Sequence, residues 1–313
     1  MSGGDRLAGR RIVLTGASSG IGLAAALALA NEGADLALLA RGERGLERAV
    51  ELAHARGVQA YALAVDVGDR EGLEAVVDEA AKLLGGIDVF ISNAAATAYG
   101  PFSEVAPDDF NRTVEVTLLG ATHAVRAVLP HLERTHGTVI GVASILSRVP
   151  MPLFASYVAA KHGLRGFLGS MRIELQAQGS RVKVAMVHPG HVDTPFWDRV
   201  QSSAGGAPPL PPAAYDPHAV AEAIVDCAVR PRAEVTVGGA AVGLGALFAV
   251  ARPLVDRLMS LEAQYLLART RPTGEPSALW SASGDGTVRP RGNGRPSALG
   301  TARAARLLTR LLP

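Results

Sequence analysis

The stretch TGASSGIG, residues 15–22, follows the short apolar run RIVLT (11–15) and leads into an alanine- and leucine-rich stretch, 23–30. This order predicts a strand, a tight turn and a helix, the setting in which a glycine-rich loop binds phosphate. Glycines here allow unusual backbone angles, close approach to an anion and tight helix packing, and the N–H groups at the helix start face the anion. The candidate phosphate-binding residues are Gly16, Ser18, Ser19, Gly20, Ile21 and Gly22.

The rest of the chain repeats the same alternation of elements. Strand-like and helix-like segments follow one another from Arg10 to about Val237, which predicts one doubly wound α/β domain with a parallel sheet. The chain has 313 residues and a single cysteine, Cys227, which excludes an internal disulfide and fits a reducing cytoplasm. The N-terminal MSGGDRLAGR lacks the apolar core of a signal peptide.

A second group of residues is suited to proton transfer. The apolar run 138–143 is followed by Ser144, and the pattern YVAAK places Tyr157 and Lys161 four residues apart on one helix face. We expect the lysine ammonium to lower the pKa of the phenol and so favour general acid/base catalysis. Ser144 can donate a hydrogen bond to a substrate oxygen as charge develops on it. Only three of the 31 basic residues are lysines, and one of them stands at position 161, where a compact positive charge is wanted.

The glycine pattern at 15–22 and the YxxxK pattern at 157–161 resemble the short-chain dehydrogenase/reductase family, over roughly residues 8–237. The resemblance implies a Rossmann-like fold with seven strands, a nicotinamide coenzyme, oxidoreductase activity on a carbonyl or alcohol, and a homodimer or homotetramer. It also implies that Tyr157 is the catalytic acid/base and that Lys161 holds the nicotinamide ribose. Further coenzyme contacts implied by the resemblance are Asp66, Val67, Asn93, Ala94, Pro189, Gly190, Val192 and Thr194. Of these, Asn93 is favoured as a structural residue that bridges strands.

One position departs from the family pattern. Many members carry an asparagine in the preceding long helix that completes a proton relay through water, and this chain has Thr117 there. A threonine hydroxyl can donate and accept a hydrogen bond but is shorter and lacks the amide. Either Thr117 and water replace the asparagine, or the relay runs differently and turnover is slower.

The end of the second strand bears on the choice of nicotinamide. NAD-binding folds commonly place an acidic residue there to accept hydrogen bonds from the ribose 2′-OH, whereas this chain has Ala40 followed by Arg41. A guanidinium can bind a 2′-phosphate through forked hydrogen bonds. We therefore expect NADP(H) in preference to NAD(H), unless Arg41 begins the next helix and points to water.

The substrate side of the sequence is rich in apolar residues, which predicts an apolar ketone, aldehyde or alcohol as substrate. Arg148 lies near enough to the expected pocket that a substrate with a carboxylate or phosphate stays open. His188 and His191 are adjacent to the site and are interpreted as structural, because no group of residues has metal-ligand spacing. The expected pocket residues are Leu146, Met151, Leu153, Phe154, Phe196 and Trp197.

The sequence beyond residue 237 divides into two parts. Residues 238–270 form an apolar helical extension, too short in its uncharged run to span a bilayer, and three interpretations are open: a lid or subunit interface, a membrane-surface helix, or core. Residues 271–313 form a tail rich in Pro, Gly and Arg that is predicted to be solvated and partly disordered, with a terminal stretch able to dock on the body. A basic tail can bind nucleic acid or anionic lipid, but without a recognised module nucleic acid is disfavoured.

Two functions remain open from the sequence. The first is an NADP(H)-dependent oxidoreductase with Tyr157 as acid/base. The second is a nucleotide-binding sensor or scaffold that keeps the fold without efficient chemistry, and Thr117 is its only support.

Overall fold

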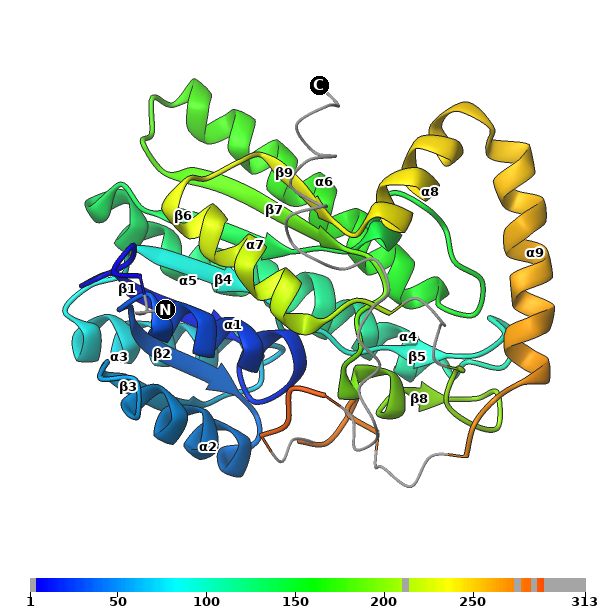
Figure 1. Ribbon diagram of the computed structural model, residues 1–313, viewed down its shortest axis with the longest axis horizontal. Coiled ribbons are helices and arrows are strands. Elements are labelled where there is room, and N and C mark those ends of the chain that lie inside the picture. The colour runs from blue at the N-terminus through cyan, green and yellow to red at the C-terminus, as the bar shows by residue number, and fades with distance from the viewer. Residues whose placement is uncertain (1–3, 210–213, 273–276, 283–285, 290–313) are drawn as a thin grey trace.

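The computed structural model describes residues 4–209, 214–272, 277–282 and 286–289, and its centre is a seven-stranded sheet (Figure 1). The strands lie in the order β3-β2-β1-β4-β6-β7-β9, and every neighbouring pair is parallel. The predicted doubly wound parallel sheet is confirmed. Its strands are β1 (Arg11–Thr15), β2 (Asp35–Ala40), β3 (Ala60–Ala64), β4 (Val89–Ser92), β6 (Thr138–Val142), β7 (Lys183–Pro189) and β9 (Glu234–Val237).

Helices cover both faces of the sheet, and the strand side chains alternate between the two resulting cores. Ile12 and Leu14 pack in the cluster that includes α1 (Gly20–Asn31), α2 (Glu43–His54) and α7 (Pro217–Val229). Val13, between them in the strand, packs in the cluster on the opposite face. That second layer is made by α3 (Arg70–Leu84), α5 (Gly120–Thr135) and α6 (Ala155–Ala177).

The crevice between β1 and β4 is where this fold places a ligand. β1 pairs with β2 on one side and with β4 on the other, so the chain reverses its winding direction at this point. In open α/β sheets ligands bind at such a switch point, beyond the carboxyl ends of the strands. The glycine loop follows β1, and Ser144 follows β6 at the same edge of the sheet.

Two local features were not predicted from the sequence. A second, two-stranded parallel sheet joins β5 (Ala98–Tyr99) to β8 (Gln201–Ser202) and ties the loop after β4 to the loop after β7. In addition, α4 (Pro107–Val114) continues into α5 through a π-helical turn, Glu115–Leu119. π-turns of this kind occur frequently at functional sites.

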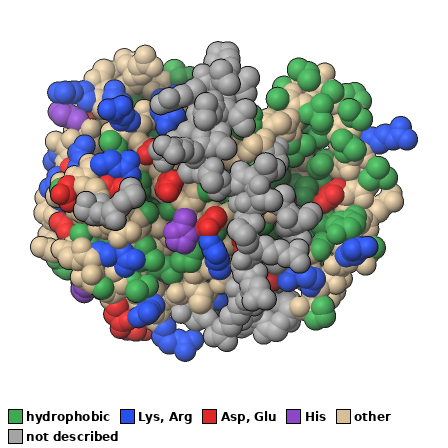
Figure 2. Space-filling model, in the orientation of Figure 1, with side chains coloured by type: hydrophobic (Ala, Val, Ile, Leu, Met, Phe, Trp, Pro, Cys, Tyr) green, Lys and Arg blue, Asp and Glu red, His purple; other side chains and the backbone are tan. Residues whose placement is uncertain are grey.

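The extension beyond β9 forms two helices, α8 (Gly239–Val250) and α9 (Arg252–Ala268), which project from one side of the sheet (Figure 1). They pack against Ile145, Leu146 and Val149, the loop that follows Ser144. Their outer side is apolar: Figure 2 shows hydrophobic side chains gathered over them, and the large exposed ones are Val250, Leu254, Leu258, Leu261, Tyr265 and Leu267. No helix in the described part of the chain is both long and apolar enough to cross a membrane.

Candidate active site

A cavity of about 220 Å³ lies at the carboxyl ends of β1 and β4, and the glycine loop forms its floor. Gly16 has φ +67°, a conformation that side chains rarely adopt. A Cβ at Gly22 would lie 2.0 Å from the carbonyl oxygen of Gly16, so the start of α1 can pack on β1 only with glycine there. At its glycine positions the loop therefore presents backbone to the cavity, as a phosphate cradle requires.

Asn93 holds this loop in place from the neighbouring strand. Its side-chain nitrogen donates to the carbonyl oxygens of Thr15 and Gly16, each at 3.1 Å. The Thr15 hydroxyl in turn accepts from the backbone N–H groups of Asn93 and Ala94, at 3.0 and 3.2 Å. These contacts bridge β1 and β4, which is the structural role favoured for Asn93.

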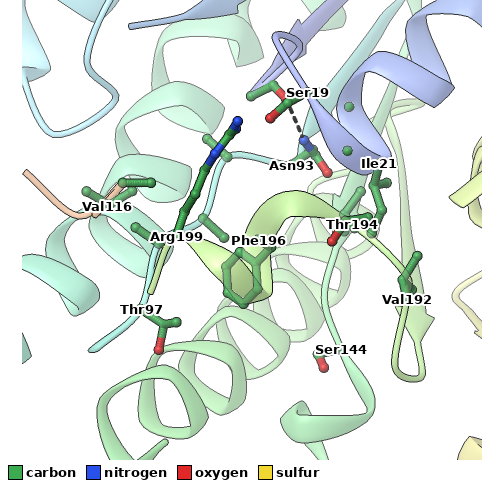
Figure 3. A pocket seen from close by; sticks show the side chains of 18 of the residues that line it. Ser19, Ile21, Asn93, Thr97, Val116, Ser144, Val192, Thr194, Phe196 and Arg199 are labelled. Atoms are coloured by element: carbon green, nitrogen blue, oxygen red, sulfur yellow. Dashed lines mark hydrogen bonds between the residues drawn. The ribbon is translucent and has the colours of Figure 1, made fainter. Parts of the chain in front are cut away.

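The structure brings the predicted coenzyme residues together around this one cavity. All seventeen border it, although they come from six separate stretches of the chain. Figure 3 shows the cavity from close by, with the Ser19 loop and Ser144 at different ends of it. The residues are Gly16, Ser18, Ser19, Gly20, Ile21, Gly22, Arg41, Asp66, Val67, Asn93, Ala94, Tyr157, Lys161, Pro189, Gly190, Val192 and Thr194.

Ser144, Tyr157 and Lys161 also meet at this cavity. Ser144 precedes a short 3-10 turn, and its hydroxyl oxygen accepts from the backbone N–H of Leu146 at 3.1 Å, which leaves its proton to donate. Tyr157 and Lys161 lie one turn apart in α6. The Lys161 ammonium is 5.5 Å from the centre of the Tyr157 ring and donates to the carbonyl oxygen of Val142 at 2.8 Å.

Burial controls the proton affinity of this pair. It lowers the pKa of Lys161 to about 7, because a charged amine loses hydration in a site where only 2 % of the side chain is exposed. Burial also raises the pKa of Tyr157 above its usual value, and a hydrogen bond with Ser144 offsets this only in part. We expected Lys161 to lower the pKa of the phenol; burial instead raises it, and the hydrogen bond with Ser144 is the contact that acts in the opposite direction.

The Thr117 hydroxyl contacts backbone groups, and the residue does not line the cavity. Its hydroxyl donates to the carbonyl oxygen of Ala96 at 2.9 Å and accepts from the Ala96 N–H at 3.2 Å. The side chain is 1 % exposed, and its neighbour Val116, not Thr117 itself, lines the cavity. The Thr117 hydroxyl uses its one proton in the hydrogen bond to the backbone after β4. These contacts give no support to the alternative in which Thr117 and water take the place of the relay asparagine.

Arg41 lines the cavity rather than facing water. It lies before α2, which begins at Glu43. Its guanidinium donates to the carbonyl oxygens of Ala278 and Leu279, the latter at 3.2 Å, and lies 3.8 Å from the Asp66 carboxylate. Burial lowers the pKa of Arg41, although the Asp66 charge acts in the opposite direction. Asp66 itself accepts hydrogen bonds from Arg112 and from the Gly68 N–H.

The substrate end of the cavity is apolar. Leu146, Phe196 and Trp197 line it as expected, and the Phe196 ring centre lies 5.6 Å from that of Tyr157. The other three expected residues do not line the cavity; Phe154 is 1 % exposed and packs against Tyr99 and Trp197 in the wall behind it. Met151 and Leu153 pack in the same cluster.

Arg148 is excluded as a substrate-binding cation by its contacts. It pairs with Glu234 and donates to the Thr236 hydroxyl at 3.3 Å, away from the cavity. Glu234 also lies 3.5 Å from His188, which is fully buried and contacts the Ser147 hydroxyl at 2.9 Å. His188 therefore braces the loop that carries Ser144, in keeping with a structural role.

Two further residues line the cavity: His191, interpreted from the sequence as structural, and Arg199, which the sequence interpretation missed. His191 lines the cavity, and its ring stacks on that of Trp197 with centres 4.8 Å apart. Arg199 is 8 % exposed and extends across the cavity in the direction of the Ser19 loop (Figure 3). Arg199 belongs to no motif, and it lies two residues before β8, the strand that pairs with β5. Within the described ranges no group of His, Cys, Asp or Glu could hold a metal ion.

The sheet, the glycine loop and the Ser-Tyr-Lys group together define a dinucleotide-binding oxidoreductase of the doubly wound class. The comparison with known families agrees: residues 10–205 match the model of the short chain dehydrogenase family, and the chain belongs to that family. A similar curated protein is the uncharacterised oxidoreductase YxnA of Bacillus subtilis, 32 % identical over 276 residues, which cover 87 % of this chain and 78 % of that protein.

Two solved structures are similar to this chain in three dimensions. One is an alcohol dehydrogenase from the archaeon Thermococcus sibiricus in complex with 5-hydroxy-NADP; it is 31 % identical, with a TM-score of 0.65 over 73 % of this chain and 95 % of that one. The other is a short chain dehydrogenase from Mycobacterium paratuberculosis bound to NAD; it is 27 % identical, with a TM-score of 0.66 over 74 % and 97 % of the two chains. A nicotinamide coenzyme is thus the expected ligand of the cavity, and these two relatives differ in which one they hold.

Proposed function

We propose that this protein is an NADP(H)-dependent oxidoreductase that interconverts a carbonyl and an alcohol on an apolar small molecule. The observation that carries the proposal is the convergence of Ser144, Tyr157 and Lys161 on the cavity whose floor is the glycine loop. The backbone floor fits a dinucleotide pyrophosphate, because Gly16 and Gly20 both have positive φ and present no side chain to the cavity.

In the reduction direction the proton comes from Tyr157. The coenzyme, when bound, supplies the hydride that reaches the carbonyl carbon. As the carbonyl π bond breaks, the phenol protonates the oxygen, and Ser144 donates a hydrogen bond to that oxygen while its charge develops. Lys161 stabilises the resulting phenolate, and the apolar wall of Leu146, Phe196 and Trp197 accepts the body of the substrate.

We propose NADP(H) because a positively charged side chain lines the adenosine end of the cleft. Arg41 lines that end, where NAD-binding folds commonly carry an acidic residue. Replacing it by aspartate, Arg41→Asp, should weaken NADPH binding at least tenfold while changing NADH binding little, because only NADPH carries the 2′-phosphate. Fluorescence titration with both coenzymes measures this, and equal losses for the two would refute the NADP(H) assignment.

The activity itself is tested by following NADPH oxidation across a graded panel of apolar aldehydes and ketones. Turnover with one or more members is expected, and it would begin to define the size of the pocket. Tight NADPH binding without turnover on any member would instead favour the sensor or scaffold function.

A further inference from the structure

Part of the C-terminal region folds back into the coenzyme cleft. Residues 277–282 and 286–289, here called the returning segment, reach the cavity, and Ala278 is one of its lining residues. The carbonyl oxygens of Ala278 and Leu279 accept hydrogen bonds from Arg41. The Ala278 N–H donates to the carbonyl oxygen of Arg199 at 2.8 Å, on the opposite side of the cleft. These two residues thus bridge both walls of the site.

Leu279 is the apolar anchor of the returning segment. Its side chain is 0 % exposed and belongs to the same hydrophobic cluster as Val65 and Val67, beside the position assigned to adenine. Its carbonyl oxygen also accepts from Arg112 at 3.4 Å. Leu279 is therefore buried in the same part of the core as Val67, a residue expected to contact the base.

Trp280 fixes the segment to the outer wall. Its indole N–H donates to the Asp109 carboxylate at 2.6 Å, and the Arg112 guanidinium lies 5.7 Å from its ring centre. Both partners are in α4, so the contact joins the segment to the helix beside the adenine position.

A second contact reaches the phosphate loop. The N–H of Gly20, the first residue of α1, donates to the carbonyl oxygen of Thr287 at 2.9 Å. This N–H is one of the helix-terminal donors that a pyrophosphate would otherwise receive. Arg289 then pairs with Asp216, at the start of α7, which anchors the far end of the segment.

We infer that the returning segment and the nicotinamide coenzyme compete for the same half of the cleft. The inference rests on the proposed function and goes beyond it. The segment accepts hydrogen bonds from Arg41, assigned to the 2′-phosphate, and from the Gly20 N–H, assigned to the pyrophosphate. It also buries Leu279 in the hydrophobic cluster that contains Val67, which is assigned to adenine. Coenzyme binding thus requires the segment to leave.

A reversible cross-link tests the competition directly in the full-length chain. A Cβ at Gly42 would lie 3.8 Å from the Cβ of Ala282, within the range that a disulfide spans. The native chain has one cysteine, Cys227, which is buried and does not interfere. The variant Gly42→Cys/Ala282→Cys can therefore be locked by oxidation and released by a thiol reductant, with each single-cysteine variant as its control.

NADPH affinity of the oxidised and reduced double variant is the measurement. We expect the reduced form to bind and the oxidised form to bind at least tenfold more weakly, since the apparent dissociation constant rises as the competent fraction falls. Equal affinity of the two forms would overturn the competition, and so would failure of the cross-link to form under oxidation, detected by mass spectrometry. No binding of NADPH or NADH by the reduced protein would instead overturn the proposed function.

A second variant should favour release of the returning segment from the cleft. Leu279→Ser removes the buried anchor, so we expect it to bind NADPH at least threefold more tightly than the unmodified chain. Leu267→Ser, at an exposed leucine of α9, is the matched control and should leave the affinity unchanged. Weaker binding in Leu279→Ser would mean that the segment helps to build the coenzyme site, contrary to the inference.

Discussion

Burial sets the charge of the two side chains at the centre of the proposed chemistry. Tyr157 holds its proton because a phenolate would lose hydration, and Lys161 gives up its proton more easily for the same reason. A protonated phenol is the form that can donate to a carbonyl oxygen, as the proposed reduction requires. The ammonium of Lys161 must nevertheless be present to stabilise the phenolate that remains.

A pH dependence follows from the pKa of Lys161, which is about 7. Below this value the free enzyme carries the ammonium, and above it the amine becomes neutral, so kcat/KM for carbonyl reduction should fall as the pH rises from 7 to 9. kcat/KM is the appropriate quantity, because its pH profile reports the groups of the free enzyme. In Lys161→Arg the charge persists at all these pH values, and the residual activity should lose this decline. A profile of the unmodified enzyme that stays flat to pH 9 would contradict the assignment.

At the scale of the elements, the strands and the glycine loop were predictable because each is encoded locally. Buried parallel strands are short apolar runs, as in RIVLT (11–15) and DLALLA (35–40), whereas the number of seven strands was implied by the family resemblance. The pairing of β5 with β8 was not predictable, since each strand has only two residues. The returning segment was expected to be solvated, apart from a terminal stretch that lies outside the described residues. Its burial depends on Arg41, 238 positions away from Leu279, which no local pattern reveals.

The packing of α1 on β1 yields a matched pair of glycine variants. Gly22→Ala would place a Cβ 2.0 Å from the Gly16 carbonyl oxygen, which should destabilise the fold by at least about 1–3 kcal/mol and weaken coenzyme binding. Gly166→Ala, in the middle of α6 with no atom within 4 Å of the new Cβ, should stabilise it by about 0.5–1 kcal/mol. Urea unfolding of the two variants checks both signs. Similar stabilities for the pair would show that the loop tolerates a side chain at residue 22.

At the scale of the whole molecule, the catalytic loop is tied to the sheet edge through a buried histidine. Burial and the nearby Arg148 and Arg165 charges lower the pKa of His188, while Glu234 and the Ser144 carbonyl act in the opposite direction. The exposed apolar side of α8 and α9 lies on the flank of the same loop (Figure 2). A subunit or membrane partner for that side stays a prediction.

Acid should therefore destabilise the protein through His188. The unfolded chain binds a proton at this residue near pH 6.5, whereas the folded chain resists it, so stability falls as the pH drops from 7 to 5. In His188→Gln this part of the loss should disappear, while His162→Gln, an exposed control in α6, should behave like the unmodified chain. Urea unfolding at the two pH values measures the difference. An unchanged pH slope in His188→Gln would show that other groups carry the acid sensitivity.

We propose that Tyr157 supplies the proton in a nicotinamide-dependent reduction, and the variant Tyr157→Phe tests this role. The substitution removes one hydroxyl and keeps the ring that packs on Phe196. We predict that turnover with a carbonyl from the panel falls by at least about 10²–10⁴-fold while NADPH affinity stays within about twofold. Tyr61→Phe, which removes an exposed phenol hydroxyl that donates to Gln59, should retain full activity. Turnover of Tyr157→Phe at the rate of the unmodified enzyme would contradict the account.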